Sequence, residues 1–205
     1  MKYKVITLFS AAAVLVLLAS SCKFKKQPDS QEAAVADSSL HNAAREIAAA
    51  TFSQLADALG NSMAFGGVQG AVDLCRLQAL PLTDSVAINY GVKVQRIAVR
   101  SRNPLNAADE SESQIFADWE KQLESGDDPS AVLLKEDDKR IWYGAIRIGN
   151  PLCLSCHGRP GRDIKTEDYQ FIRESYPQDK AIDFRLGDIR GAWKISFPDD
   201  YQIDS

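Results

Sequence analysis

Histidine, methionine and cysteine are scarce in this 205-residue chain, which contains two His, two Met and four Cys. So few His, Met and Cys side chains exclude several metal centres built from these ligands, because each centre needs its own ligand set. No internal repeat is present, which excludes a solenoid or an array. No Ser/His pair or pair of carboxylates stands out from an ordinary acidic surface, so we expect that the protein is not an enzyme.

Two of the cysteines and one of the histidines form the motif Cys153-Leu154-Ser155-Cys156-His157. C-x-x-C-H is the attachment signature of a c-type haem, in which Cys153 and Cys156 form thioethers and His157 becomes an axial ligand of the iron. Half of a zinc site and a thioredoxin-like redox pair are the alternatives. A zinc site needs a further soft ligand, and a redox C-x-x-C normally opens a helix in a βαβ unit without a trailing His. The motif therefore predicts one covalently bound haem c.

Long hydrophobic runs are also rare. The run over residues 5–19 is too short for a comfortable transmembrane helix but suits a signal peptide, since two lysines precede it. Small residues and then Cys22 follow, which is typical of a bacterial lipoprotein signal. We predict a lipoprotein signal peptide over residues 1–21 and acyl chains on Cys22. Simple cleavage with a free Cys22, or an uncleaved anchor, are the alternatives.

These features predict a bacterial cell-envelope protein on the periplasmic side, because haem c is attached after export. Removing residues 1–21 takes away Lys2 and Lys4, so the formal net charge falls from -4 to -6. An acidic chain argues against nucleic acid or anionic lipid as a partner held by charge. We expect membrane attachment through the lipid anchor and a redox partner in the periplasm or the membrane.

The composition indicates one folded domain. Residues 22–40 are polar and rich in Ala and Ser, a composition that buries too little apolar area to fold, and we predict a flexible tether there. Residues 41–205 have the length of a single domain with one core.

Hydrophobic spacing within this domain predicts an α+β fold. Helical periodicity covers residues 42–63, 69–80 and 83–89, with breaks at a glycine-rich stretch and at Pro81. Ser111 and Gln114 have the spacing of a capping box for a helix that ends at Gly126. Alternation predicts strands over residues 92–100, 131–135, 140–148 and 189–197, with a hairpin between the middle two. We expect an antiparallel sheet with long N-terminal helices on one side and the haem between them.

Cys75 is the thiol that neither lipid nor haem attachment explains. It lies on an apolar stripe of its helix, which fits a small buried hydrophobic residue. Alternatively, its thiolate ligates the iron opposite His157. Met63, His41, a lysine amine or an open position are the other candidates, and residue types alone do not choose among them.

Arg100, Arg102 and Arg190 are candidates for pairing with the haem propionates, because a guanidinium binds a carboxylate in a bidentate manner. An ordinary solvated surface position is the alternative for each of them. The three tryptophans are expected to pack in the core and the haem pocket.

Several segments together resemble one family over most of the mature chain. They are, in order, Ala71-Val72-Asp73-Leu74-Cys75, Arg100-Ser101-Arg102-Asn103-Pro104-Leu105-Asn106, Pro151-Leu152-Cys153-Leu154-Ser155-Cys156-His157-Gly158, Tyr176-Pro177-Gln178-Asp179-Lys180-Ala181 and Gly187-Asp188-Ile189-Arg190-Gly191. This combination resembles the Tll-type c-haem domain, long catalogued as a domain of unknown function. The resemblance implies a PAS-like α+β fold with one haem and with Cys75 as the axial ligand opposite His157. The chain departs from the family pattern at Ile182-Asp183-Phe184, where a Thr-Gly pair is more usual.

A thiolate ligand would give this haem the chemistry of a sensor. Its negative charge stabilises ferric iron and lowers the reduction potential. Protonation of Cys75 on reduction would weaken the bond and open a site for a diatomic gas. We therefore predict a haem-based redox or gas sensor-like protein. A periplasmic electron-transfer cytochrome is the alternative, which the lack of any kinase, cyclase or methyl-accepting segment in the sequence favours.

Overall fold

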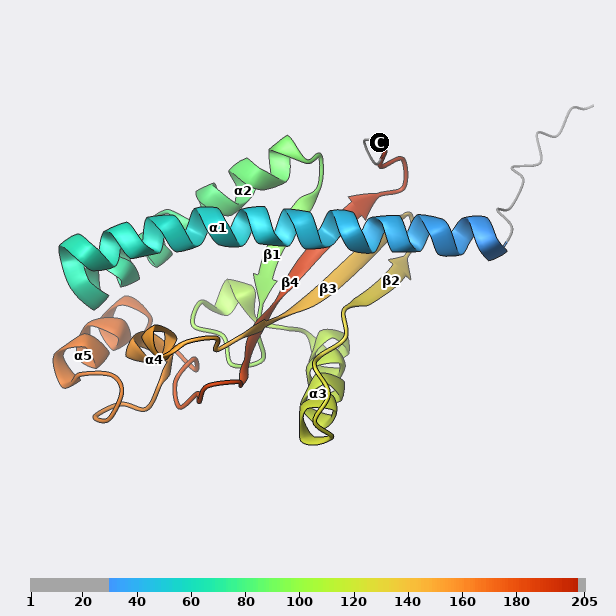
Figure 1. Ribbon diagram of the computed structural model, residues 1–205. Coiled ribbons are helices and arrows are strands. Elements are labelled where there is room, and N and C mark those ends of the chain that lie inside the picture. Colours follow the sequence, from blue (N-terminus) through green and yellow to red (C-terminus); the bar gives the residue numbers. More distant parts are fainter. Residues whose placement is uncertain (1–29, 203–205) are drawn as a thin grey trace, which may run out of the picture.

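The structure is a computed structural model that describes residues 30–202 (Figure 1). The predicted signal peptide, Cys22 and the first part of the predicted tether lie outside these residues. The helices are α1 (Ser30–Leu77), α2 (Ala79–Asn89), the short 3-10 helix η1 (Pro104–Asn106), α3 (Glu110–Glu124), α4 (Pro151–His157) and α5 (Thr166–Ser175). The strands are β1 (Lys93–Ile97), β2 (Val132–Glu136), β3 (Lys139–Arg147) and β4 (Ile189–Pro198).

The four strands form one antiparallel sheet in the order β1-β4-β3-β2. The hairpin between β2 and β3 turns at Asp137, which has a φ of 49°. Aspartate tolerates this left-handed conformation better than most residues, which suits it to the turn. The predicted α+β fold with an antiparallel sheet is confirmed.

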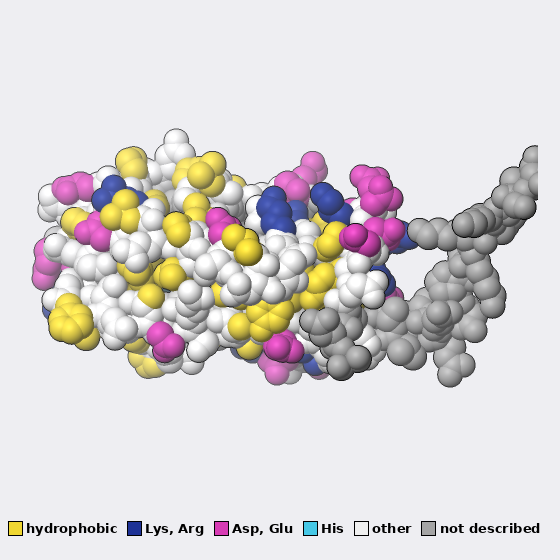
Figure 2. All heavy atoms as spheres, turned by 90° about the horizontal axis from the view of Figure 1, so that it is seen from above, with side chains coloured by type: hydrophobic (Ala, Val, Ile, Leu, Met, Phe, Trp, Pro, Cys, Tyr) yellow, Lys and Arg dark blue, Asp and Glu magenta, His cyan; other side chains and the backbone are white. Residues whose placement is uncertain are grey.

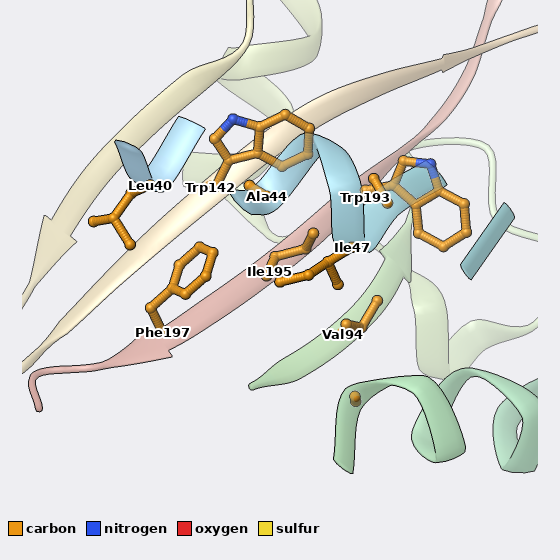
Figure 3. Packing of buried hydrophobic residues seen from close by; sticks show 10 residues of the cluster. Leu40, Ala44, Ile47, Val94, Trp142, Trp193, Ile195 and Phe197 are labelled. Atoms are coloured by element: carbon orange, nitrogen blue, oxygen red, sulfur yellow. The ribbon is translucent and has the colours of Figure 1, made fainter. Parts of the chain in front are cut away.

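The first half of α1 covers one face of the sheet (Figure 3). Successive side chains of a strand point to opposite faces, so every second residue of β4 points toward α1. The buried residues of this cluster include Leu40, Ala44 and Ile47 of α1, Val94 of β1, Trp142 of β3, and Trp193, Ile195 and Phe197 of β4. The helical residues are three and four apart, which places them along one side of α1. This packing fixes the long helix to the sheet.

Helix α3 covers the opposite face of the sheet, so the prediction that the helices lie on one side is wrong. Phe116 and Trp119 of α3 pack in a second cluster with Ile141 and Tyr143 of β3. Trp142, between those two strand residues, belongs to the α1 cluster. β3 is therefore apolar on both faces, and a sheet with two apolar faces needs a helix on each.

Helix α1 begins earlier than the sequence predicts. It starts at Ser30, and Leu40 is 1 % exposed within the core. The prediction of a flexible tether over residues 22–40 is therefore wrong for residues 30–40. Alanine, glutamine and glutamate are good helix formers, and extending a helix from an anchored turn is much easier than starting a new one.

The chain turns within α1 at a glycine, as the glycine-rich stretch predicts. Gly67 has a φ of 59° and a ψ of -151°, a conformation that is open essentially only to glycine. A Cβ on Gly70 would lie 2.8 Å from the Ser62 carbonyl oxygen, so the chain after the turn lies close against the chain before it. The predicted break at Pro81 is wrong, because Pro81 lies in the first turn of α2. Its missing N–H is harmless at that position.

Helix α3 is capped by Asp109 rather than by the predicted Ser111. The Asp109 Oδ1 accepts from the Glu112 N–H at 2.8 Å, and the Glu112 Oε2 accepts from the Asp109 N–H at 3.0 Å. Ser111 instead donates to the same Asp109 oxygen. Asp109 and Ser111 each have a Glu or Gln three positions later, which is the spacing of a capping box. Asp109, the earlier of the two, caps the helix. Gly126 follows the last turn with a φ of 87°, as predicted.

The surface of the molecule is mixed in character. Figure 2 shows hydrophobic side chains in separate patches on the face seen from above Figure 1, with charged groups between them. Phe52 and Phe65 of α1 are exposed. Within residues 30–202, no helix combines the length and the apolar character needed to cross a membrane.

Candidate functional site

The C-x-x-C-H motif forms the short helix α4, which follows β3 after a brief turn. Asn150 caps this helix, since its Oδ1 accepts from the Leu152 N–H at 2.9 Å, and Pro151 suits the first helical position. Residues three apart lie on the same side of a helix, which places Cys153 and Cys156 together. Both are partly buried free thiols. The motif therefore offers two neighbouring thiols with an imidazole at the next position.

The surroundings of α4 do not favour the two alternative interpretations of the motif. The strands before and after it, β3 and β4, are antiparallel neighbours, so α4 is not the helix of a βαβ unit. Among residues 30–202 there is no group of three or more His, Cys, Asp or Glu side chains that could hold a metal ion. Neither a thioredoxin-like pair nor a zinc site finds support in this part of the chain.

The loop of residues 179–184 holds His157 in place. The Nδ1 of His157 lies 2.9 Å from the Ala181 carbonyl oxygen. A carbonyl only accepts, so Nδ1 carries the proton and Nε2 keeps its lone pair. The Phe184 N–H donates to the His157 carbonyl oxygen at 3.0 Å, and the Asp183 N–H donates to that of Gly158 at 2.9 Å. Backbone and ring are thus both fixed by one loop.

The imidazole of His157 is held in its neutral form. Burial, followed by the positive charges of Arg190 and Arg102, keeps the pKa of His157 well below its ordinary value. The Arg190 Nε lies 3.2 Å from the Nδ1 and 3.4 Å from the Nε2 of His157, and with Nδ1 protonated only Nε2 has a lone pair that can accept from it. Burial and the neighbouring Arg102 lower the pKa of Arg190 to about 9. A neutral imidazole with one unprotonated nitrogen is the form that ligates a transition metal.

Arg102 lies within the site rather than on a solvated surface. Its Nε forms a buried ion pair with the Asp179 Oδ1 at 3.2 Å. Its Nη2 donates to the carbonyl oxygens of Cys156 and Ala181. Arg102 therefore joins the end of α4 to the loop that holds His157.

Arg100 and Arg190 lie beside the same loop. The Arg100 Nη1 donates to the Ile182 carbonyl oxygen at 3.0 Å, and its guanidinium carbon lies 3.6 Å from the centre of the Phe184 ring. Arg190 contacts the His157 ring and donates to the Arg100 carbonyl oxygen. The three arginines selected from the sequence are thus brought together, and each already has a protein partner.

Cys75 lies near the end of α1 and is exposed, although its neighbour Leu74 is buried. The interpretation of Cys75 as a small buried hydrophobic residue is therefore wrong. Its thiol is close enough to Cys156 and to Arg190 to influence their pKa values. The fold thus brings Cys75 and the C-x-x-C-H motif into one neighbourhood, because α1 packs on α5 and the following segment.

The other candidates for a sixth ligand lie in different places. The Nδ1 of His41 accepts from the Trp142 indole N–H at 3.0 Å, where α1 packs on the sheet. Met63 lines a surface hollow of about 390 Å³ together with Gly67 and with Ser155 of α4. Met63 is therefore near the motif, whereas His41 is engaged with the core of the domain.

Sequence reasoning missed Arg96, Tyr176 and Asp179. Burial lowers the pKa of Arg96, and the nearby Cys75 and Tyr176 oppose this shift. Arg96 is two residues from Val94, which packs toward α1, so it shares that face of β1. A charged residue at an inward strand position was the signal that could have revealed it.

The electrostatic character of this neighbourhood is positive. Besides burial, Arg102 and Arg96 both lower the pKa of Arg190, and Asp179 opposes this shift. Burial raises the pKa of Cys156 to about 11, so this thiol is neutral, while Arg102 opposes the shift. Partly buried cations favour a nearby anionic group, such as a thiolate or a carboxylate.

Comparisons with known proteins identify the family to which this chain belongs. No curated protein matches it. A solved structure described as that of the cyanobacterial heme-protein Tll0287 covers 86% of this chain and 100% of its own, with 20% sequence identity and a TM-score of 0.51, which shows a shared fold. The model of the Tll0287-like family matches residues 25–198, which is most of the chain. The resemblance seen in the sequence is thereby confirmed, and this chain belongs to the Tll0287-like family.

Proposed function

We propose that this chain is an exported haem c protein of the cell envelope that acts as a redox or gas sensor. In this proposal Cys153 and Cys156 hold one haem by thioethers, and His157 and Cys75 are the axial ligands. The main support is that Cys75 lies near Cys156 of the motif, next to which His157 is neutral and protonated at Nδ1. The relative of known structure is described as a heme-protein, which supports it further.

The residues of the site fit this cofactor. A haem would supply a redox-active iron and two propionates. Cys153 and Cys156 are free thiols one helical turn apart, and His157 has a lone pair on Nε2. Ligation through Nε2 requires Arg190 to give up its contact with that nitrogen. Its guanidinium is then available to pair with a propionate, while Arg102 stays with Asp179.

Cys75 suits the role of a ligand that leaves on reduction. Arg96 and Arg190 lie near Cys75, and a thiolate ligand would stabilise ferric iron. When Cys75 takes up a proton and withdraws, a position for a diatomic gas opens. This is the chemistry of a sensor with a PAS-like arrangement, and no catalysed reaction is assigned to it.

Carbon monoxide distinguishes the sensor from an electron carrier. We expect the reduced protein to bind it, with a shift of the Soret band, because protonated Cys75 leaves the iron. The reduced protein before carbon monoxide is added serves as the control. A reduced protein that stays six-coordinate and ignores carbon monoxide contradicts the sensor proposal and favours an electron-transfer cytochrome.

The membrane anchor is tested at Cys22, which lies outside the described residues. We propose that its acyl chains hold the protein at the membrane, as buried methylenes contribute about 0.8 kcal/mol each. Cys22→Ala is expected to move most of the exported protein into the soluble fraction, with its haem content unchanged. Cell fractionation followed by haem staining measures both. A variant that is cleaved to the mature size and still remains in the membrane fraction contradicts the lipid anchor.

A further inference from the structure

The buried ion pair between Arg102 and Asp179 does not only fill space, since both side chains also bind the loop that contacts His157. From its contacts we infer that this pair is the positioning element for His157 and that it tunes the iron through the Ala181 carbonyl. The inference rests on the proposed ligation of the iron by His157. Arg102 and Asp179 belong to segments far apart in the sequence, and their side chains are 10% and 0% exposed.

Both polar groups of Ala181 are fixed by this pair. The Asp179 Oδ1 accepts from the Ala181 N–H at 2.8 Å, and the Arg102 Nη2 donates to the Ala181 carbonyl oxygen at 3.2 Å. The same carbonyl oxygen lies 2.9 Å from the Nδ1 of His157. The pair therefore orients the Ala181 carbonyl group, which sets the tautomer and the orientation of the imidazole.

The same guanidinium also reaches the motif helix. The Arg102 Nη2 donates to the carbonyl oxygen of Cys156, the residue before His157. One side chain thus binds both the residue before His157 and the carbonyl group that accepts the ring proton of His157. A guanidinium suits this role, because its planar donors can serve several acceptors at fixed angles.

The two charges of the pair act on the ring in opposite directions. Arg102 draws electron density from the Ala181 carbonyl, which makes this oxygen a weaker acceptor for the Nδ1 proton and His157 a weaker donor to iron. Asp179 offsets that positive charge. Its second oxygen, Oδ2, is buried and has no partner among the described residues, so the balance depends on Arg102.

Reduction potentials test the inference. If the ion pair only holds the loop of residues 179–184 in place, the two single variants do not shift the potential in opposite directions. Asp179→Asn leaves the Arg102 cation uncompensated, which disfavours ferric iron, so we expect a higher potential than in the parent. Arg102→Gln removes the cation and is expected to lower it. The double variant is expected to return close to the parent. Spectroelectrochemical titration of the four haem-loaded full-length proteins provides the potentials.

The outcomes separate this inference from the proposed function. A parent protein without covalent haem overturns both. Two results with a haem-loaded parent overturn the inference alone. In the first, the reduction potentials of both single variants fall, because a loosened loop admits water and favours ferric iron in either variant. In the second, neither reduction potential changes. Should Arg102→Gln not fold, Asp179→Asn decides by itself. The asparagine oxygen still accepts from the Ala181 N–H, and only the charge effect raises the potential.

Discussion

Replacing Cys153 and Cys156 together by alanine is expected to abolish covalent haem attachment. Each thiol forms one thioether in the proposed arrangement, so the double variant has no covalent link left. The protein is matured in a host that attaches haem c, and denaturing electrophoresis with haem staining then shows whether the pigment migrates with the polypeptide. We expect a stained band for the parent and none for the variant.

Cys75→Ala is the matched control for this experiment, since it also removes a thiol near the motif. It is expected to keep the stained band, because Cys75 forms no thioether in the proposal. Both thiols of the motif are only partly buried, so we expect their replacement by alanine to leave the fold in place. A double variant that retains haem after denaturation contradicts the assignment of the motif.

Leu40→Ala is expected to destabilise the protein by about 2–5 kcal/mol. Leu40 is 1 % exposed and belongs to the cluster that joins α1 to the sheet (Figure 3). Truncation leaves a cavity between α1 and β4, whereas helix propensity is unaffected, because Leu and Ala both favour helices. Chemical denaturation with the fluorescence of the tryptophans as the signal measures the free energy of unfolding.

Leu77→Ala is the control in the same helix, because Leu77 is 59 % exposed. Its effect is expected to stay within about 0.5 kcal/mol. If both substitutions have equally small effects on the free energy of unfolding, the result would support the flexible tether that composition predicted for residues 22–40. The pair of variants therefore tests where the folded domain begins.

The sheet could be predicted from sequence because its signals are local. Alternation of apolar and polar residues marks the strands, and the acidic turn at Asp137 joins β2 to β3. The side of the sheet that each helix covers could not be predicted in this way. The spacing of Phe116 and Trp119 shows that α3 has an apolar face, but the opposite face of β3 becomes visible only in the folded sheet.

The candidate site shows the same division between local and long-range signals. The C-x-x-C-H motif is local, and the sequence alone identifies it. The roles of Arg102 and Asp179 depend on a partner far along the chain, so residue type suggested only a propionate contact for Arg102. Cys75 was assigned through the resemblance to a family, and the structure adds that its thiol is exposed and near Cys156.

The central claim is that His157 and Cys75 are the two axial ligands of one haem c. The most direct test is the ultraviolet-visible spectrum of the matured, oxidised protein, compared between the parent and Cys75→Ala. We expect the parent to be low-spin with a thiolate-type spectrum, and the variant to keep its covalent haem but change coordination. Two coincident spectra would contradict it, because Cys75 would then not be bound to the iron.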